Sequence, residues 1–241
     1  MKAVALKTKI KQLRFVLTRW VHEQTWAHLE NIRTCELDTV LRLLPAGGRI
    51  LEIGAGTGWQ ANSLKHRGYE VHAIDLPASN YRENRIWPVI DYDGKNIPFA
   101  DNTFDVIFSS NALEHIPHIR EFQEELHRVL KPAGIAIHVI PSGSWRFWTN
   151  VAFFLTVWTF SAPHGEHAKN SFTEIFYFSH RWWARLFTDT GWQVAAYRPN
   201  KLFYTGCSIM DARLNIALRK KLSYILGSSC HIFILRENNS S

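Results

Sequence analysis

Three closely spaced glycines follow a short apolar run near residue 50, and they are the clearest chemical feature of the sequence. The segment reads Ile50-Leu-Glu-Ile-Gly-Ala-Gly-Thr-Gly58. Glycine permits a tight turn and lets a ligand approach bare backbone. The spacing is GxGxG, because positions 59 and 61 hold Trp and Ala, and so it differs from the GxGxxG of dinucleotide sites. We expect this turn to join a strand to a helix whose N-terminus faces a ligand.

A carboxylate stands at an informative distance after these glycines. Asp75 ends a second apolar run, Glu70–Asp75, about twenty residues after the turn. A carboxylate in this position can accept hydrogen bonds from both ribose hydroxyls of an adenosine. The alternative is an ordinary solvated aspartate in a turn. Together with the glycines, Asp75 predicts a site for a nucleoside-containing ligand.

Three histidines are candidates for proton transfer. His115 follows the apolar run 104–109 and could act as a general base, or it could only fix the turn before Pro117. His164 and His167 flank Gly-Glu in a less regular stretch, where they could contact a substrate, act as bases or belong to a plain loop. No metal site is predicted, because no third cluster of ligands lies near this pair in the sequence.

Apolar runs alternate with helical segments, and this alternation predicts the elements that position these residues. Strands are expected at 49–53, 70–75, 86–91, 104–109, 134–140, 192–197 and 230–235. Helices are expected at 1–30, 36–44, 59–67, 119–130 and 179–188, with an irregular stretch over 142–178. Lys131-Pro-Ala-Gly134 is expected to close the fourth of these helices. Repeated strand–helix units favour an α/β fold with a doubly wound parallel sheet.

Six sequence blocks in a fixed order resemble the class I S-adenosylmethionine (SAM) dependent methyltransferases, in particular the branch that acts on small molecules. The blocks are Leu51–Gly58, Ile74-Asp75, Asp93 with Ile97-Pro-Phe99, Phe104–Ile107, Asn111–Ile116 and Leu126–Gly134. Two departures from the family pattern are Ala133 and Lys95. The resemblance implies a doubly wound, mostly parallel seven-stranded sheet, with added N-terminal helices and an aromatic-rich insertion after strand five.

The same resemblance implies roles for individual residues. Glu52 would hold the methionine amino group, and Asp75 would take the ribose hydroxyls. Asp93, beside Gly94, would accept from the adenine amino group. Leu76 and Ile97 could sandwich adenine or belong to the core. The remaining expected cofactor contacts give backbone room or line the methionine end, and they are Gly54, Ala55, Gly56, Gly58, Ser109, Ser110 and Asn111.

We expect one methyltransferase domain over residues 1–241. Within it, 1–45 would be an N-terminal helical cap, 49–140 the SAM-binding core, 142–178 a substrate or lid insertion and 179–241 the C-terminal part of the sheet. The insertion is rich in Trp and Phe, which could form a lid over a hydrophobic or lipid-linked substrate, or a pair of helices packed on the sheet.

Composition restricts the class of protein further. Hydrophobic residues make up 46% and charged residues 20% of 241 residues, which excludes a disordered chain. Three widely spaced cysteines without a CxxC pair indicate neither a disulfide framework nor a zinc ribbon, and they suit a reducing cytoplasm. The stretch 151–160 is too short to span a bilayer, which needs about 20 residues, and no secretory signal is recognised.

The formal net charge of +7 favours an anionic or amphiphilic partner. The basic segment before Glu23 could cap the cofactor pocket or touch an anionic membrane surface, whereas nucleic acid is disfavoured because no recognition module is present. The expected activity is transfer of the SAM methyl group to a small-molecule, sugar or lipid-linked acceptor at oxygen, by in-line displacement. The alternatives are a SAM-binding protein without transfer activity and an NAD-dependent enzyme on a similar sheet.

Overall fold

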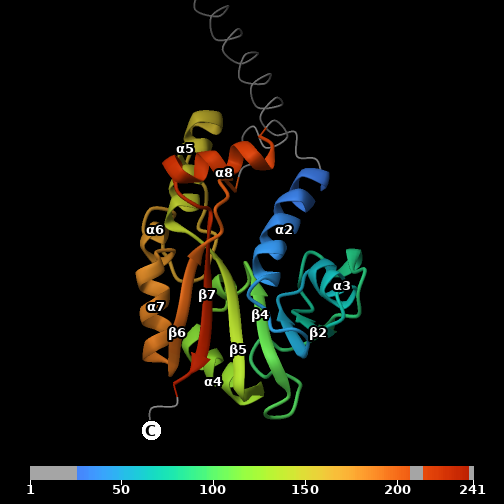
Figure 1. Ribbon diagram of the computed structural model, residues 1–241. Coiled ribbons are helices and arrows are strands. Elements are labelled where there is room, and N and C mark those ends of the chain that lie inside the picture. Colours follow the sequence, from blue (N-terminus) through green and yellow to red (C-terminus); the bar gives the residue numbers. More distant parts are fainter. Residues whose placement is uncertain (1–25, 207–213, 239–241) are drawn as a thin grey trace, which may run out of the picture.

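The computed structural model describes residues 26–206 and 214–238, and its centre is a seven-stranded sheet (Figure 1). The strand order is β3-β2-β1-β4-β5-β7-β6, with β7 antiparallel to both of its neighbours and the other neighbouring pairs parallel. The strands are β1 (Arg49–Ile53), β2 (Glu70–Asp75), β3 (Ile90–Asp91), β4 (Phe104–Ser110), β5 (Leu130–Pro141), β6 (Trp192–Pro199) and β7 (Cys230–Glu237). The predicted mostly parallel seven-stranded sheet is therefore confirmed.

Helices cover both faces of this sheet (Figure 1). They are α2 (Trp26–Leu41), α3 (Trp59–Lys65), α4 (Ile119–Val129), α5 (Gly143–Val157), α6 (Glu174–Tyr177), α7 (His180–Asp189) and α8 (Ile216–Leu226), with short 3-10 turns η1 (Arg82–Asn84) and η2 (Leu113–His115). Side chains alternate along each strand, so β1 directs Leu51 and Ile53 into the core shared with α4 and α7. Ile50 packs on the opposite face, in the core shared with α2 and α3.

Two strands, β3 and β5, begin four residues away from the expected position, whereas β4, β6 and β7 begin as expected and end one or two residues later. β3 has only two residues, because the chain before it bonds to the glycine turn: the Ile86 amide donates to the Thr57 carbonyl at 2.8 Å. β5 begins at Leu130, so residues 131–134 lie within the strand and do not form the predicted turn. The pairing of β4 with β5 is irregular between Phe104 and Val106, which accommodates Pro132, a residue without an amide hydrogen.

The helical expectations were wrong in three places. Two separate helices were expected at 1–30 and 36–44, but α2 runs without a break from Trp26 to Leu41. Residues 1–25 of the first expected helix lie outside the described residues. α5 fills much of the stretch expected to be irregular, and α8 was not predicted. Ser142 and Asn215 cap these two helices by accepting from the amides of Trp145 and Leu218.

α5 escaped prediction because apolar residues occur on most of its sides, which hides the helical period. The structure supports the helical alternative for this stretch over an irregular one. Within residues 26–206 and 214–238, no helix has the length and apolar character needed to cross a membrane.

Candidate functional site

The glycine turn lies at the carboxyl end of β1 and forms a cradle of bare backbone. Gly54, Gly56 and Gly58 have φ angles of 69°, 57° and 76°, in the left-handed region that favours glycine. A Cβ atom on Gly54 would lie 2.4 Å from the Cβ of Ala112, and one on Gly58 would lie 2.5 Å from the Cβ of Trp87. Both turn conformation and close packing therefore require glycine here, as expected from the sequence.

Asp75 is fixed to this turn by two backbone hydrogen bonds. Its Oδ2 accepts from the amide of Gly56 and its Oδ1 from the amide of Leu76, each at 2.8 Å. A carboxylate has about four acceptor positions, so lone pairs remain for a ligand. Ala55 belongs to the same turn, and its amide donates to the Ile74 carbonyl at 3.1 Å. The predicted ribose acceptor and the glycine cradle are therefore adjacent.

Glu52 is buried under the turn, and its Oε2 atom has no hydrogen-bond partner in the described structure. Burial is the main cause that raises the pKa of this carboxyl to about 8. A hydrogen bond with the Ala61 backbone partly offsets this effect, and the negative charge of the nearby Asp75 adds to it. A buried carboxylate oxygen without a partner is costly unless a ligand supplies a donor. This is the chemistry expected of a residue that holds an ammonium group.

The next strand end brings Leu76 and Gly94 together. Leu76 is exposed, and a Cβ atom on Gly94 would lie 2.9 Å from its Cδ2 atom. Asp93 accepts at Oδ1 from the amides of Lys95 and Asn96, and the Asn96 side chain donates to its Oδ2. These hydrogen bonds lower the pKa of Asp93 to about 2, and the bond from the Asn96 side chain has the largest effect.

Leu76 is placed as an exposed apolar surface next to this acidic loop, which suits the predicted adenine contact. Ile97 was expected either to contact adenine or to belong to the core. It is buried in the core with α4, which favours the second alternative.

The residues at the end of β4 have different surroundings. Ser109 is fully buried, and its Oγ shares a 2.8 Å hydrogen bond with Nδ1 of His138. Burial lowers the pKa of His138 to about 3, so this imidazole is neutral. Asn111 has a φ of 53°, and its side chain contacts the Sγ atom of Cys230 and the hydroxyl of Ser110. Ser110 and Asn111 are partly exposed, whereas Ser109 is engaged inside the sheet.

A second polar centre begins three residues after Asn111. Glu114 is completely buried, and neither of its carboxylate oxygens has a hydrogen-bond partner among the described residues. Its Oε1 atom lies 3.9 Å from Nε2 of His115 and 3.9 Å from Nε2 of His164. The two imidazole rings contact each other with centroids 4.7 Å apart. Two of the predicted histidines thus converge on a glutamate that sequence reasoning had missed.

The electrostatics of this cluster follow from its burial. Desolvation raises the pKa of Glu114 to about 8 and lowers that of His164 to about 4, and it also lowers the pKa of His115. Both imidazoles are therefore neutral and available as proton acceptors or ligands near pH 7.

A buried ion pair holds His164 in place. Glu174 accepts at Oε1 from the amides of His164 and Gly165, at 2.7 and 2.6 Å. Its Oε2 lies 2.8 Å from Nε of Arg146, and both side chains are almost fully buried. Arg146 also donates to Ser161 and Ala162 in the same loop. The loop then docks on η2, because the Glu166 amide donates to the Glu114 carbonyl at 3.0 Å.

His167, the third predicted candidate, lies in different surroundings. Its ring contacts Tyr177, Trp182 and Trp183. Burial lowers its pKa, and its Nε2 atom has no hydrogen-bond partner in the described structure. No contact of His167 with His115 or with Glu114 is seen among the described residues. The structure therefore brings together His115 and His164 but not His167.

Two aromatic residues at the glycine turn were also missed. Trp87 packs against Gly58, and Tyr81 lies above Gly56 at 3.4 Å from a Cβ atom placed there. Both come from the segment between β2 and β3. Tyr81 lies between two expected strands and Trp87 lies within the strand expected at 86–91, so the sequence marked neither as a residue of the turn.

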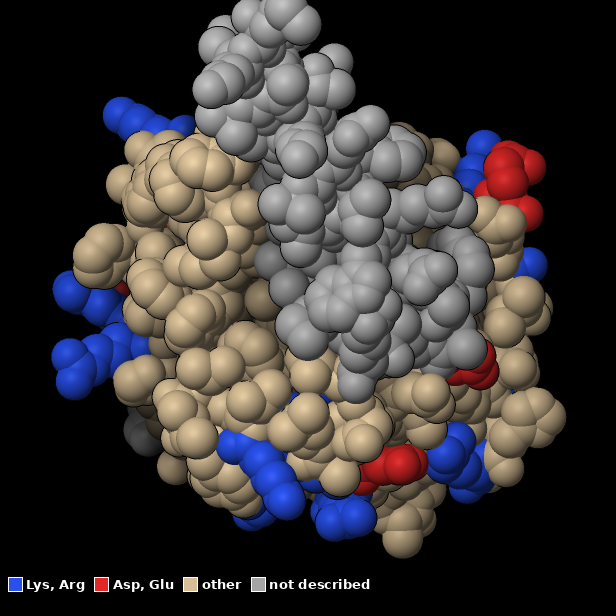
Figure 2. Space-filling model, turned by 90° about the horizontal axis from the view of Figure 1, so that it is seen from above, with Lys and Arg blue, Asp and Glu red and all other residues tan. Residues whose placement is uncertain are grey.

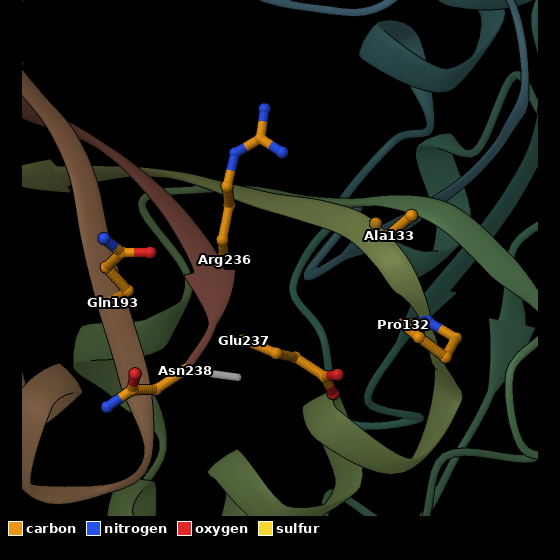
Figure 3. Close-up of a pocket in the computed structure, with 7 residues that line it drawn as sticks. Pro132, Ala133, Gln193, Arg236, Glu237 and Asn238 are labelled. Carbon is orange, nitrogen blue, oxygen red and sulfur yellow. The ribbon is translucent and has the colours of Figure 1, made fainter. Parts of the chain in front are cut away.

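Figure 2 views the molecule from the end at which β4 and β5 finish. Lys and Arg side chains lie mainly around the rim of this face, with a few Asp and Glu side chains among them. A pocket at the opposite end of the sheet contains none of the predicted residues; it is lined by Pro132, Ala133, Gly134, Gln193, Arg236, Glu237 and Asn238 (Figure 3). In Figure 3, Arg236 and Glu237 leave β7 in different directions, so their charges do not converge on one ligand.

Comparison with known proteins agrees with this geometry. Residues 51–138 match a family model described as a methyltransferase domain. The chain is 38% identical over 93 residues to a demethylmenaquinone methyltransferase of Corynebacterium urealyticum, covering 38% of this chain and 40% of the relative. It is 32% identical over 104 residues to a malonyl-[acyl-carrier protein] O-methyltransferase of Enterobacter lignolyticus, covering 41% of each. The chain thus spans about two fifths of the length of these curated relatives.

The fold is shared over a greater length. A SAM-dependent methyltransferase from Mesorhizobium loti superposes with a TM-score of 0.58 at 16% sequence identity, over 84% of this chain and 98% of that structure. The sequence likeness is thus concentrated in the segment that carries the glycine turn, Asp75, Asp93 and η2, while the arrangement of the sheet extends well beyond it.

Proposed function

Because this chain belongs to the class I SAM-dependent methyltransferase family, we propose that it transfers the methyl group of SAM to a hydroxyl of a small-molecule, sugar or lipid-linked acceptor. The observation that carries the proposal is the coincidence of two sites at one edge of the sheet. Gly54 of the glycine turn packs against Ala112, and Glu114 follows two residues later. A cofactor in the first site would therefore be close to a substrate in the second.

The residues of the turn fit the family's cofactor. Glu52 offers a buried oxygen without a partner, which suits the methionine ammonium group. Asp75 retains acceptor capacity beside Gly56, which suits the ribose hydroxyls. The glycines leave no side chain above the turn, and Leu76 with Asp93 offers an apolar face and an acceptor for adenine.

When bound, SAM supplies a sulfonium-activated methyl group, so the protein need not form a covalent intermediate. The residues of the chain must position an acceptor oxygen in line with that methyl group and exclude water. They must also remove the hydroxyl proton of the acceptor. His115 and His164 are both neutral and contact each other edge to face, so each has a lone pair that can accept this proton. His115 is the stronger base of the two, because burial lowers the pKa of His164 further, to about 4. His167 remains a weaker candidate because it packs among aromatic rings away from this pair.

The surface next to the site supports an amphiphilic acceptor. Phe154, Trp158, Phe160 and Phe172 form a chain of ring contacts at the end of α5 and in the loop between α5 and α6, which also contains His164. All four are substantially exposed. Exposed aromatic groups of this size are typical of surfaces that bind apolar ligands or lipid. A peripheral membrane contact is compatible with the same surface and with the positive net charge.

Isothermal calorimetry with S-adenosylhomocysteine tests the cofactor assignment. Wild-type protein should bind it with micromolar affinity, and Asp75→Ala should weaken binding tenfold or more, since a charge-assisted hydrogen bond contributes about 1.5–3 kcal/mol. Asp101→Ala is the matched control, because this exposed aspartate pairs with Arg128 away from the turn. Equal affinity of wild type and Asp75→Ala would overturn the ribose assignment.

A transfer assay with labelled SAM and a panel of hydroxyl acceptors then tests the activity. Binding of S-adenosylhomocysteine without transfer to any acceptor would favour a cofactor-binding protein without catalysis. Binding of NAD in place of S-adenosylhomocysteine would favour an oxidoreductase.

A further inference from the structure

The Glu114–His115–His164 cluster has the composition and geometry of a metal centre. We propose that it binds one divalent transition-metal ion of the zinc or manganese type, with Oε1 of Glu114 and the ring nitrogens of His115 and His164 as ligands. One ligand atom from each residue can be chosen such that all three lie within 4.8 Å of one another. His115 and His164 were expected to take part in chemistry, but their convergence on Glu114 was not, because the ligands come from η2 and from a loop some fifty residues later.

The distances need only a small adjustment to hold an ion. Bonds of about 2.0–2.1 Å to zinc place tetrahedral ligand atoms about 3.3–3.5 Å apart. Oε1 of Glu114 is 3.9 Å from each of the two Nε2 atoms. The imidazole ligand atoms lie within 4.8 Å of each other, so side-chain rotations must shorten the Glu114 distances by about 0.5 Å and the distance between the imidazoles by at most about 1.5 Å.

Glu114 supplies the independent observation that a ligand belongs here. Its side chain is completely buried, and both oxygens lack a hydrogen-bond partner in the described part of the chain. The nearby arginines make their ion pairs elsewhere: Arg33 pairs with Glu36 at 2.7 Å and Arg146 with Glu174 at 2.8 Å. Arg33 acts on Glu114 through its charge, which partly offsets the rise in the pKa of Glu114 that burial causes, but it does not donate a hydrogen bond to it. A buried carboxyl group whose two oxygens have no hydrogen-bond partner is costly whether it is protonated or ionised. A cation between Glu114 and the two imidazoles would satisfy it.

The donor set selects the class of ion. Two neutral imidazoles and one carboxylate suit zinc, manganese, iron or cobalt, whereas magnesium and calcium prefer oxygen ligands alone. His115 and His164 are each about two fifths exposed, which leaves a path for the ion and open positions on it. Three protein ligands with an open position are typical of catalytic metal sites.

The role of the ion rests on the proposed function, whereas the site itself does not. An acceptor hydroxyl bound to the ion would lose its proton to water, because the ion lowers the pKa of the oxygen. The oxygen would then form a bond to the methyl carbon, and the carbon–sulfur bond would break with its electron pair retained by sulfur. His115 and His164 would then act as ligands rather than as bases.

Metal binding is measured on the full-length, tag-free chain after dialysis against EDTA. Titration with zinc chloride in a calorimeter should give one equivalent with micromolar or tighter affinity. Co²⁺ should give a visible absorption band of a nitrogen- and oxygen-ligated ion. Glu114→Gln and His164→Ala should each weaken zinc binding by 100-fold or more. His66→Ala, a change of a surface histidine at the end of α3, should leave it unchanged.

S-adenosylhomocysteine binding by the same samples separates the two proposals. Retained binding in Glu114→Gln, together with lost zinc binding, supports the metal site in a folded protein. If Glu114→Gln fails to fold, His164→Ala serves in its place, since that side chain is partly exposed. Wild-type protein that binds S-adenosylhomocysteine but no zinc or manganese, or that binds zinc equally well in His164→Ala, would overturn the metal site and leave the proposed function standing. Wild-type protein that binds zinc but not S-adenosylhomocysteine would support the metal site and overturn the proposed function.

Discussion

The Oε1 atom of Glu114 lies 3.9 Å from Nε2 of His164, although fifty positions separate the two residues in the chain. Glu114 belongs to η2 after β4, and His164 belongs to the loop between α5 and α6. The two meet because Glu174 binds the backbone of His164 and Gly165, while the Glu114 carbonyl accepts from Glu166. Residues without a direct role in chemistry therefore position the candidate catalytic cluster.

Removal of one partner of the buried ion pair should destabilise the fold strongly. In Arg146→Met, the carboxylate of Glu174 would remain buried without its countercharge, which typically costs about 3–5 kcal/mol. Urea unfolding at neutral pH measures this free energy. The control is Arg185→Met, whose exposed pair with Asp189 at 3.8 Å should contribute less than about 1 kcal/mol. Similar losses in the two variants would contradict a structural role for the buried pair.

A methyl group on Gly58 should damage both stability and cofactor binding. The new Cβ atom would lie 2.5 Å from Cβ of Trp87, in addition to the strain of a φ of 76°. Gly68→Ala is the matched control, because Gly68 also has a positive φ, of 91°, but has open space around it. We expect Gly68→Ala to cost about 1 kcal/mol, with S-adenosylhomocysteine affinity unchanged. Gly58→Ala should cost more and reduce the affinity at least tenfold. Equal affinities in the two variants would argue against the cradle.

Glu52 should make the ligand-free protein less stable as the pH rises. Burial raises the pKa of its carboxyl from 4.5 to about 8 in the folded state. Below about pH 4.5 the carboxyl is protonated in both states, so its contribution is fully present there. Between about pH 4.5 and 8 the unfolded state loses the proton while the folded state keeps it, and stability falls by up to about 1.4 kcal/mol per pH unit.

Glu52→Gln removes this titration. The stability difference between wild type and Glu52→Gln, measured by urea unfolding at several pH values, should therefore grow in favour of the variant up to about pH 8 and then level off. A difference that does not change with pH would show that Glu52 is ionised in the folded protein. The comparison isolates Glu52, because the other titrating groups are common to both proteins.

The exposed aromatic surface at the end of α5 should bind anionic vesicles. Phe154 and Phe172 each contact Phe160, and all three are exposed. We expect the full chain to co-sediment with vesicles of phosphatidylglycerol at low salt and less at high salt, because basic residues contribute part of the attraction. The double variant Phe154→Ser/Phe172→Ser should lose at least half of this binding. Ile90→Ser, at the exposed edge strand β3, is the control. No binding at low salt would exclude this contact.

The sequence alone determined the order of the sheet's parallel strands along the chain and the position of the glycine turn. β1 and β2 have the predicted bounds, because each is a short, mostly buried run that ends at a glycine turn or at aspartate. Gly54, Gly56, Gly58 and Asp75 lie together because the carboxyl ends of neighbouring parallel strands meet at one edge. These are local patterns, and local patterns are visible in a sequence.

The tertiary structure decided the rest. α5 was hidden because its apolar residues contact neighbours on several sides, so no helical period marks it. Glu114 looked like an ordinary polar residue beside His115, and only the fold shows that it is buried without a partner and that His164, not His167, is brought to it. Long-range contacts of this kind depend on Arg146 and Glu174, whose pairing leaves no spacing or period in the chain.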